Sequence, residues 1–185
     1  NQYEQHVRNG RKIMKANVRH EQFTVRAGGQ LVGTVRVPGD KSISHRSVML
    51  SSIASGVSQI RGWLAAGDTE ATLGAMQALG VKVERHDLNT LTIHGGQLQQ
   101  TAAPLDLVNA GTGIRLLAGI MVGQDFPSVL DGSSQLRRRP MKRVTVPLEM
   151  MGADITATDG KAPPSSQPTH IKGRTDDMPL ASGQV

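Results

Sequence analysis

Basic and hydroxyl side chains are concentrated in one short segment, Pro38-Gly39-Asp40-Lys41-Ser42-Ile43-Ser44-His45-Arg46. Apolar residues then recur at helical spacing: Ile43, Met49, Leu50, Ile53 and Ala54. Gly56 follows them, and glycine is typical of helix C-termini. We expect Ser42 or Ser44 to cap this helix. Because a helix start presents unpaired N–H groups and partial positive charge, Lys41 and Arg46 beside it predict a site for an anion. The alternative is a capped surface helix whose basic residues are merely solvated.

Three later segments carry related patterns. They are Asn109-Ala110-Gly111-Thr112-Gly113-Ile114-Arg115-Leu116-Leu117, Leu136-Arg137-Arg138-Arg139-Pro140-Met141 and Ala181-Ser182-Gly183-Gln184-Val185. Together with the first segment, they resemble the motifs of the enolpyruvyl transferases, in particular those that act on shikimate 3-phosphate. The resemblance covers about residues 22–185, and four motifs in one order are more specific than any of them alone.

The residues between these motifs predict an α/β fold. We expect strands within 22–37 around the turn at Gly28-Gly29, then a strand over 58–64, a helix capped by Asp68, and a hairpin of strands 81–85 and 90–94. The later part predicts a helix over 111–122, a strand over 128–130, a helix ending at 150–153, and strands at 155 and 169–171. Pro147 should mark the start of that last helix or a kink in it, and residues 163–168 should form a loop.

The two parts of this pattern correspond to each other. Arg46 matches Arg115, and Leu79-Gly80-Val81 matches Met151-Gly152-Ala153, at a spacing of roughly 70 residues that suits a duplicated βαβαββ unit. Ser182 stands where a third helix would begin. We therefore expect two copies plus the start of a third, in a chain that is cut short.

The resemblance implies a domain organisation. Enolpyruvyl transferases build such units into an inside-out α/β barrel, with two domains that close on the substrates. Residues 1–21 would be a leader, a linker or the tail of a preceding region, and we expect them to be disordered. Residues 22–37 would supply strands of the second, mostly absent domain, and residues 38–185 a truncated first domain.

Composition limits the partners. The chain has 185 residues, a net charge of +6 and a pI near 10.2, which predicts an anionic partner. The four aromatic residues are scattered singly, so no base-stacking platform is visible, and small phosphorylated or carboxylated substrates explain the charge at least as well as nucleic acid. The absence of cysteine fits a reducing compartment, and no apolar run is long enough to span a bilayer. We expect a cytoplasmic protein without membrane contact.

The resemblance further implies a reaction, in which the enolpyruvyl group of phosphoenolpyruvate moves to the 5-hydroxyl of shikimate 3-phosphate and phosphate is released. Lys41, the implied catalytic residue, would lie between the two substrates. Ser42 and Arg46 would hold shikimate 3-phosphate.

The later motifs would complete the site. Gly111 and Thr112, beside Asn109, would approach phosphoenolpyruvate through the backbone, and Arg139 would clamp its phosphate. Ser182-Gly183-Gln184 would reach the phosphate of shikimate 3-phosphate and the enolpyruvyl group.

Two residues are expected to act behind the ligands. Asp68 would be a helix cap and a supporting partner, and Arg115 would orient Asn109 or pair with Asp68. Three positions depart from the family pattern: Val108 replaces a glycine, so a positive φ there would be costly, Ser133-Ser134-Gln135 replaces acidic and serine residues, and Gly183 replaces a small side chain.

The resemblance implies no cofactor and no metal. The known inhibitor glyphosate would occupy the phosphoenolpyruvate subsite. The full-length enzyme is expected to be a monomer. Because the family's general acid and base lie in its second half, we expect this chain alone to bind shikimate 3-phosphate weakly without turnover. Two alternatives stay open. One is the UDP-N-acetylglucosamine enolpyruvyl transferase of wall synthesis, whose reactive cysteine is missing here. The other is a non-catalytic basic module that binds nucleic acid or polyphosphate with steep salt dependence.

Overall fold

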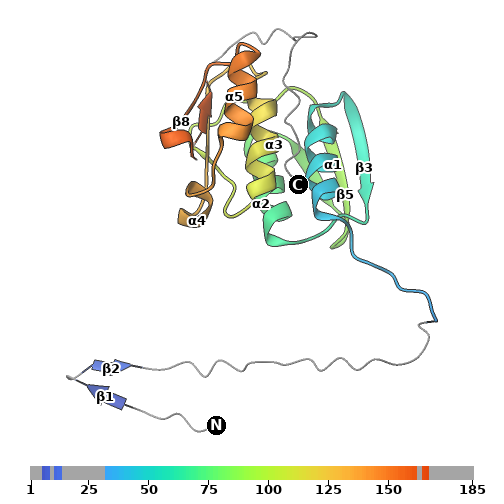
Figure 1. Cartoon of the computed structure of the whole chain (residues 1–185). Coiled ribbons are helices and arrows are strands. Elements are labelled where there is room, and N and C mark those ends of the chain that lie inside the picture. The colour runs from blue at the N-terminus through green and yellow to red at the C-terminus, as the bar shows by residue number, and fades with distance from the viewer. Residues whose placement is uncertain (1–5, 9–10, 14–31, 162–163, 167–185) are drawn as a thin grey trace. The chain divides into compact units, whose positions relative to one another are not determined.

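The computed structural model describes residues 6–8, 11–13, 32–161 and 164–166, and the chain divides into two units after Arg36 (Figure 1). The first unit contains an antiparallel pair of short strands, β1 (His6–Arg8) and β2 (Arg11–Ile13), within the predicted leader. The rest of residues 1–21 and residues 22–31 lie outside the described residues. Residues 32–37 are described and form no strand, so that part of the predicted strands over 22–37 is wrong.

The second unit begins with two helices and a three-stranded sheet. Helices α1 (Lys41–Ile53) and α2 (Gly67–Ala78) alternate with β3 (Gly56–Arg61), and β4 (Lys82–Arg85) and β5 (Thr90–Gly95) form the predicted hairpin. The antiparallel sheet has the order β3-β5-β4, and α1 packs on β3 and β5. Strand β3 ends earlier than predicted because Gly62 turns the chain with a φ of +73°.

The rest of the unit follows a similar order. It contains β6 (Leu105–Asp106), α3 (Gly111–Met121), β7 (Ser128–Asp131), α4 (Ser134–Arg137), α5 (Lys142–Met150), β8 (Ile155–Ala157), η1 (Thr158–Gly160) and β9 (Pro164–Ser166). The sheet order is β6-β7-β9-β8, with β6 parallel to β7. Within the described ranges, no helix is long and apolar enough to cross a membrane.

Two predictions in this part need correction. Residues 164–166 form strand β9 rather than a loop, because they pair with β7 and β8, while the predicted strand 169–171 lies outside the described residues. Helix α5 begins five residues before Pro147 and continues past it, so the prediction that the helix starts near Pro147 is wrong. The amide of Met151 donates to the Pro147 carbonyl at 3.1 Å, which carries the helix past the missing proline donor.

Strands β7-β9-β8 of the second sheet share the order and the pairing register of β3-β5-β4. Ile93 of β5 pairs with Ser58 of β3 and Val83 of β4, and Ser166 of β9 pairs with Ser128 of β7 and Ile155 of β8. These matched positions lie about 70 residues apart along the chain, at the spacing of the repeat seen in the sequence. The predicted start of a third copy lies outside the described residues.

Helices α1, α2 and α3 pack against one another in all three pairs (Figure 1). The apolar residues that α2 and α3 turn toward each other are mostly buried, including Met76 and Ile114. The buried face of α1 is instead partly polar, while Ile43 and Leu50 are 68% and 61% exposed. The buried hydroxyl of Ser44 donates to the Asp40 carbonyl at 2.7 Å and accepts from the Leu64 amide at 2.9 Å, so its polar atom is satisfied.

Candidate anion-binding site

The start of α1 carries Lys41, Ser42 and Arg46, as predicted, but its cap is Asp40. The Asp40 Oδ1 accepts from the Ile43 amide at 2.7 Å, so the prediction of Ser42 or Ser44 as the cap is wrong. Ser42 lies half-buried in the first turn, and the exposed Arg46 donates from Nη1 to the Ser42 carbonyl at 3.1 Å. The guanidinium therefore folds back over the first turn of the helix.

Asp68 supports Lys41 instead of capping α2. The cap of α2 is Ala66, whose amide donates to Thr69 Oγ1 at 3.0 Å, so the prediction for Asp68 is wrong by two residues. Asp68 lies in the first turn, and its Oδ2 is 3.0 Å from Lys41 Nζ. With the two side chains 50% and 29% exposed, this ion pair orients the ammonium group but contributes little to stability.

The N-terminal halves of the three helices meet at His45 of α1, Thr72 of α2 and Gly113 of α3. His45 Nδ1 is hydrogen-bonded to Thr72 Oγ1 at 2.7 Å. A Cβ at Gly113 would lie 2.6 Å from Thr72 Oγ1 and 3.5 Å from His45 Cε1, so the absence of a side chain lets α3 approach. Because Gly113 lies against His45 and Thr72, the starts of α1 and α3 lie at the same end of the group of helices α1, α2 and α3, which we call the helix group.

Lowering the pH from 7.5 to 5.5 should destabilise the fold through His45, which is fully buried. Burial lowers the pKa of His45 below its ordinary 6.5; nearby Asp68 opposes this, whereas Lys41 and Arg46 add to it. The unfolded chain thus gains a proton near pH 6.5 and the folded chain only at lower pH. The contribution of the neutral His45 to the free energy of unfolding is fully present above pH 6.5. Below pH 6.5 it decreases by at most about 1.4 kcal/mol per pH unit.

Thermal unfolding of the original chain and of His45→Asn, measured across this pH range, checks this effect. The asparagine does not titrate, and its side chain can still bond to Thr72. The variant should therefore show the smaller loss of stability on acidification, and equal losses would contradict the role of His45.

The start of α3 is the second part of the site. Helix α3 begins at Gly111, with the half-buried Thr112 next to it, and opens with N–H groups that have no partner within the helix. The Arg139 guanidinium lies against Gly111, because Arg139 Nη1 occupies the space that a Cβ would take and Arg139 Cζ would be 3.2 Å from it. The structure thus brings Gly111 and Arg139 together, two residues that sequence reasoning assigned to one ligand.

Arg115 joins this group from the next turn of α3. Its Nη1 donates to the Gly111 carbonyl at 2.8 Å and its Nη2 donates to the Pro140 carbonyl at 3.0 Å. Among the described residues, these two backbone carbonyls are its only hydrogen-bond partners, so both partners predicted for it, Asn109 and Asp68, are wrong. Burial, then the charges of Arg139 and Arg143, lower the pKa of Arg115, but a guanidinium remains protonated at neutral pH.

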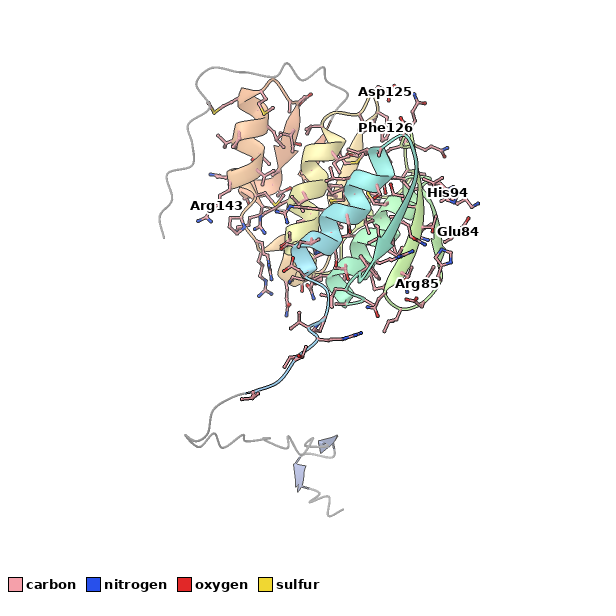
Figure 2. All side chains as sticks on the ribbon, turned by 90° about the vertical axis from the view of Figure 1, so that its right-hand side faces the viewer. Glu84, Arg85, His94, Asp125, Phe126 and Arg143 are labelled. Carbon is pink, nitrogen blue, oxygen red and sulfur yellow. The ribbon has the colours of Figure 1, made fainter. Side chains whose placement is uncertain are left out.

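Arg143, on the first turn of α5, was missed by sequence reasoning. It is exposed and close enough to affect Arg115, and Figure 2 shows it on the opposite side of the unit from Glu84, Arg85 and His94. As far as the described residues go, none of Arg115, Arg139 and Arg143 has a carboxylate partner. The sequence signal that could have identified Arg143 is its position four residues after Arg139. Three guanidinium groups without a carboxylate partner concentrate positive charge beside the start of α3, which suits a multiply charged anion.

Asn109 is oriented by Ser133. The Ser133 hydroxyl donates to Asn109 Oδ1 and accepts from the Leu136 amide at the start of α4. The loop before α3 thus depends on one of the serines that depart from the family pattern. Ser182, Gly183 and Gln184 lie outside the described residues.

Val108, directly before Asn109, adopts a φ of +50° despite its branched side chain. Its amide donates to Asp106 Oδ1 at 2.8 Å and its carbonyl accepts from the Ser133 amide at 2.8 Å, and these bonds hold the unfavourable backbone conformation.

Val108→Gly should therefore stabilise the chain by about 1 kcal/mol, because glycine adopts a positive φ without steric cost. The valine side chain is 48% exposed, so its loss removes little packing. Urea unfolding measures the change. Val108→Ala is the control, since alanine keeps most of the steric cost, and a glycine variant no more stable than the alanine variant would contradict strain at this position.

Known proteins are similar to this chain over most of its length. The family model described as EPSP synthase (3-phosphoshikimate 1-carboxyvinyltransferase) matches residues 25–185. The 3-phosphoshikimate 1-carboxyvinyltransferases of Hydrogenovibrio crunogenus and Methylococcus capsulatus are 52% and 49% identical to this chain over 169 and 168 residues. These matches cover 89% and 88% of this chain and 38% of each relative.

A solved structure of EPSP synthase from Acinetobacter baumannii superposes with a TM-score of 0.74 at 42% sequence identity. The match covers 82% of this chain and 36% of that protein. The chain therefore spans a little over a third of the length of the relatives that it matches. The family resemblance seen in the sequence is confirmed, and the chain belongs to the EPSP synthase family.

Proposed function

We propose that this chain supplies one substrate-binding part of an enzyme that transfers the enolpyruvyl group from phosphoenolpyruvate to the 5-hydroxyl of shikimate 3-phosphate, with release of phosphate. Family membership supports this proposal, and so do two helix starts at one end of a helix group, each with basic side chains. The observation that carries it is the Arg139 guanidinium held against Gly111, because this pair forms a preorganised place for a phosphate group.

In this proposal, shikimate 3-phosphate binds at the start of α1. Arg46, which is exposed and engages only a carbonyl of its own helix among the described residues, can turn to form a bidentate contact with the substrate carboxylate. Ser42 lies in the same first turn, and Ser182, Gly183 and Gln184 would complete this subsite.

Phosphoenolpyruvate binds at the start of α3. The backbone of Gly111 and Thr112 approaches it, and Arg139 neutralises its phosphate, which leaves with more negative charge than it carries as an ester. Lys41, held by Asp68 at 3.0 Å, reaches toward the reacting atoms between the two anions. Electrostatic positioning of this kind lowers the barrier without a cofactor.

Further properties belong to the same proposal. Glyphosate competes at the phosphoenolpyruvate subsite, the complete enzyme is a cytoplasmic monomer, and this chain alone binds shikimate 3-phosphate weakly without turnover. These expectations follow from the family resemblance. The expected lack of turnover also follows from the length of the matched relatives, of which this chain covers 38%.

The experiment is to fuse this chain to the part of the Hydrogenovibrio crunogenus relative that follows its aligned region, and to measure phosphate release. Release that requires both phosphoenolpyruvate and shikimate 3-phosphate supports the proposal, with the added part alone as the control. A folded fusion that releases no phosphate, or that accepts UDP-N-acetylglucosamine instead, would contradict it.

A further inference from the structure

We propose that Arg115 is a positioning residue that holds Arg139 over the start of α3 and thereby sets the affinity of the phosphoenolpyruvate subsite. This inference rests on the proposed function, since it concerns the same subsite. It assigns to Arg115 a role that differs from that of every other basic residue of the site.

The geometry of Arg115 joins two segments that are distant in sequence. One end of its guanidinium donates to the carbonyl of Gly111, the first residue of α3, and the other end donates to the carbonyl of Pro140, the residue directly after Arg139. Because the guanidinium is rigid and planar, these two bonds fix the separation of the two carbonyls. The backbone next to Arg139 is therefore held at a fixed distance from the backbone of Gly111.

The other contacts of the turn make this tie effective. The Arg139 amide donates to the Leu136 carbonyl at 2.9 Å, and the Met141 amide donates to the Gly160 carbonyl at 2.8 Å. The turn is thus bonded to α4 and to η1 on its two flanks, and Arg115 is the residue that bonds it to α3. Without Arg115, the turn keeps its fold but loses its register against Gly111.

Arg115 is poorly suited to contact the ligand itself. Both of its terminal nitrogens donate to backbone carbonyls, and the residue is half-buried, so an anion would have to break two charge-assisted bonds to recruit it. Arg46 occupies the matching position of α1, yet it is exposed and donates to one carbonyl of its own helix. The equivalent arginines of the two copies therefore have different roles. Arg46 faces a ligand, whereas Arg115 holds the turn that carries Arg139.

The test compares Arg115→Lys with Arg85→Lys. Lysine keeps the charge at both positions but cannot span two carbonyls, and the Arg85 guanidinium is bonded to the Glu70 carboxylate instead. Titration of each chain with phosphoenolpyruvate, and separately with shikimate 3-phosphate, is followed by amide NMR shifts at Gly111 and Ser42. Arg115→Lys should weaken phosphoenolpyruvate binding at least about tenfold and leave shikimate 3-phosphate within about twofold, whereas Arg85→Lys should change either by less than threefold.

Two results would overturn the inference. Equal phosphoenolpyruvate affinity in the original chain and Arg115→Lys would remove the positioning role while leaving the proposed function standing. No phosphoenolpyruvate shift at Gly111 in the original chain would instead count against the proposed function and the inference together. Since Arg115→Lys could unfold, Arg115→Gln is titrated in parallel, and the Nε–Hε relaxation of Arg139 is recorded; a side chain no more mobile in either folded variant would also overturn the role.

Discussion

Lys41→Met should reduce phosphate release by the fused enzyme at least about a thousandfold, which corresponds to roughly 4 kcal/mol of lost transition-state stabilisation. The Lys41 ammonium lies at the first residue of α1 and is held 3.0 Å from Asp68, at the end of the helix group where α3 also begins. In the proposed function, its charge lies where the two anions meet and where charge develops during transfer. Methionine has a similar length but cannot supply that charge.

Lys82→Met is the matched control for this prediction. Lys82 lies on β4, and its Nζ is 2.9 Å from Glu84 Oε1 in an exposed pair, so the same substitution removes a comparable ion pair away from the helix starts. Rates of the two variants are compared at saturating concentrations of both substrates. A loss below tenfold for Lys41→Met, with the protein folded, would contradict a catalytic role.

Gly111→Ala should weaken glyphosate binding about a hundredfold, roughly 2.7 kcal/mol, and leave shikimate 3-phosphate binding almost unchanged. The new methyl group would occupy the space of Arg139 Nη1 and lie 3.4 Å from Arg115 Nη1. Because these atoms end flexible side chains, the protein folds, but Arg139 must leave its position over α3. The methyl group also takes space that the ligand needs.

Gly119→Ala tests whether this effect is specific to the start of α3. Gly119 lies on the same helix, and a Cβ there would meet no atom within 4 Å of the described residues. The control should bind glyphosate normally and be slightly stabilised, since alanine favours helix. Calorimetric titration of both variants in the fused enzyme gives the comparison, and equal glyphosate affinity would contradict the assignment of the subsite.

Much of the helical framework could be predicted because its signals are local. The spacing of apolar residues located α2 and α3, and glycine closed helices near the expected positions. The caps were less predictable, since Asp40, Ser42 and Ser44 are all suitable cap residues and the choice depends on the path of the preceding chain. Strand β9 was missed because Pro164 favours a loop, while its pairing with β7 and β8 depends on residues far away in sequence.

The candidate site divides in the same way. The residue types at Lys41 and Arg46 pointed to anions, the family resemblance added Gly111 and Arg139, and the structure places Arg139 against Gly111. The partners of Arg115 could not be foreseen, because they are backbone carbonyls, which every residue has and which only the fold brings into range. The positive φ of Val108 shows a further limit, since hydrogen bonds to Asp106 and Ser133 override the local preference of valine.

In the proposed function, the starts of α1 and α3 form one site for two small anions. Amide NMR of the isotope-labelled chain, titrated with shikimate 3-phosphate and then with glyphosate, tests this arrangement. We expect shikimate 3-phosphate to shift Lys41, Ser42 and Arg46, and glyphosate to shift Gly111 and Thr112, with modest salt dependence. Binding of a polyphosphate or a nucleic acid with steep salt dependence, and with no preference for either small anion at these amides, would contradict the claim.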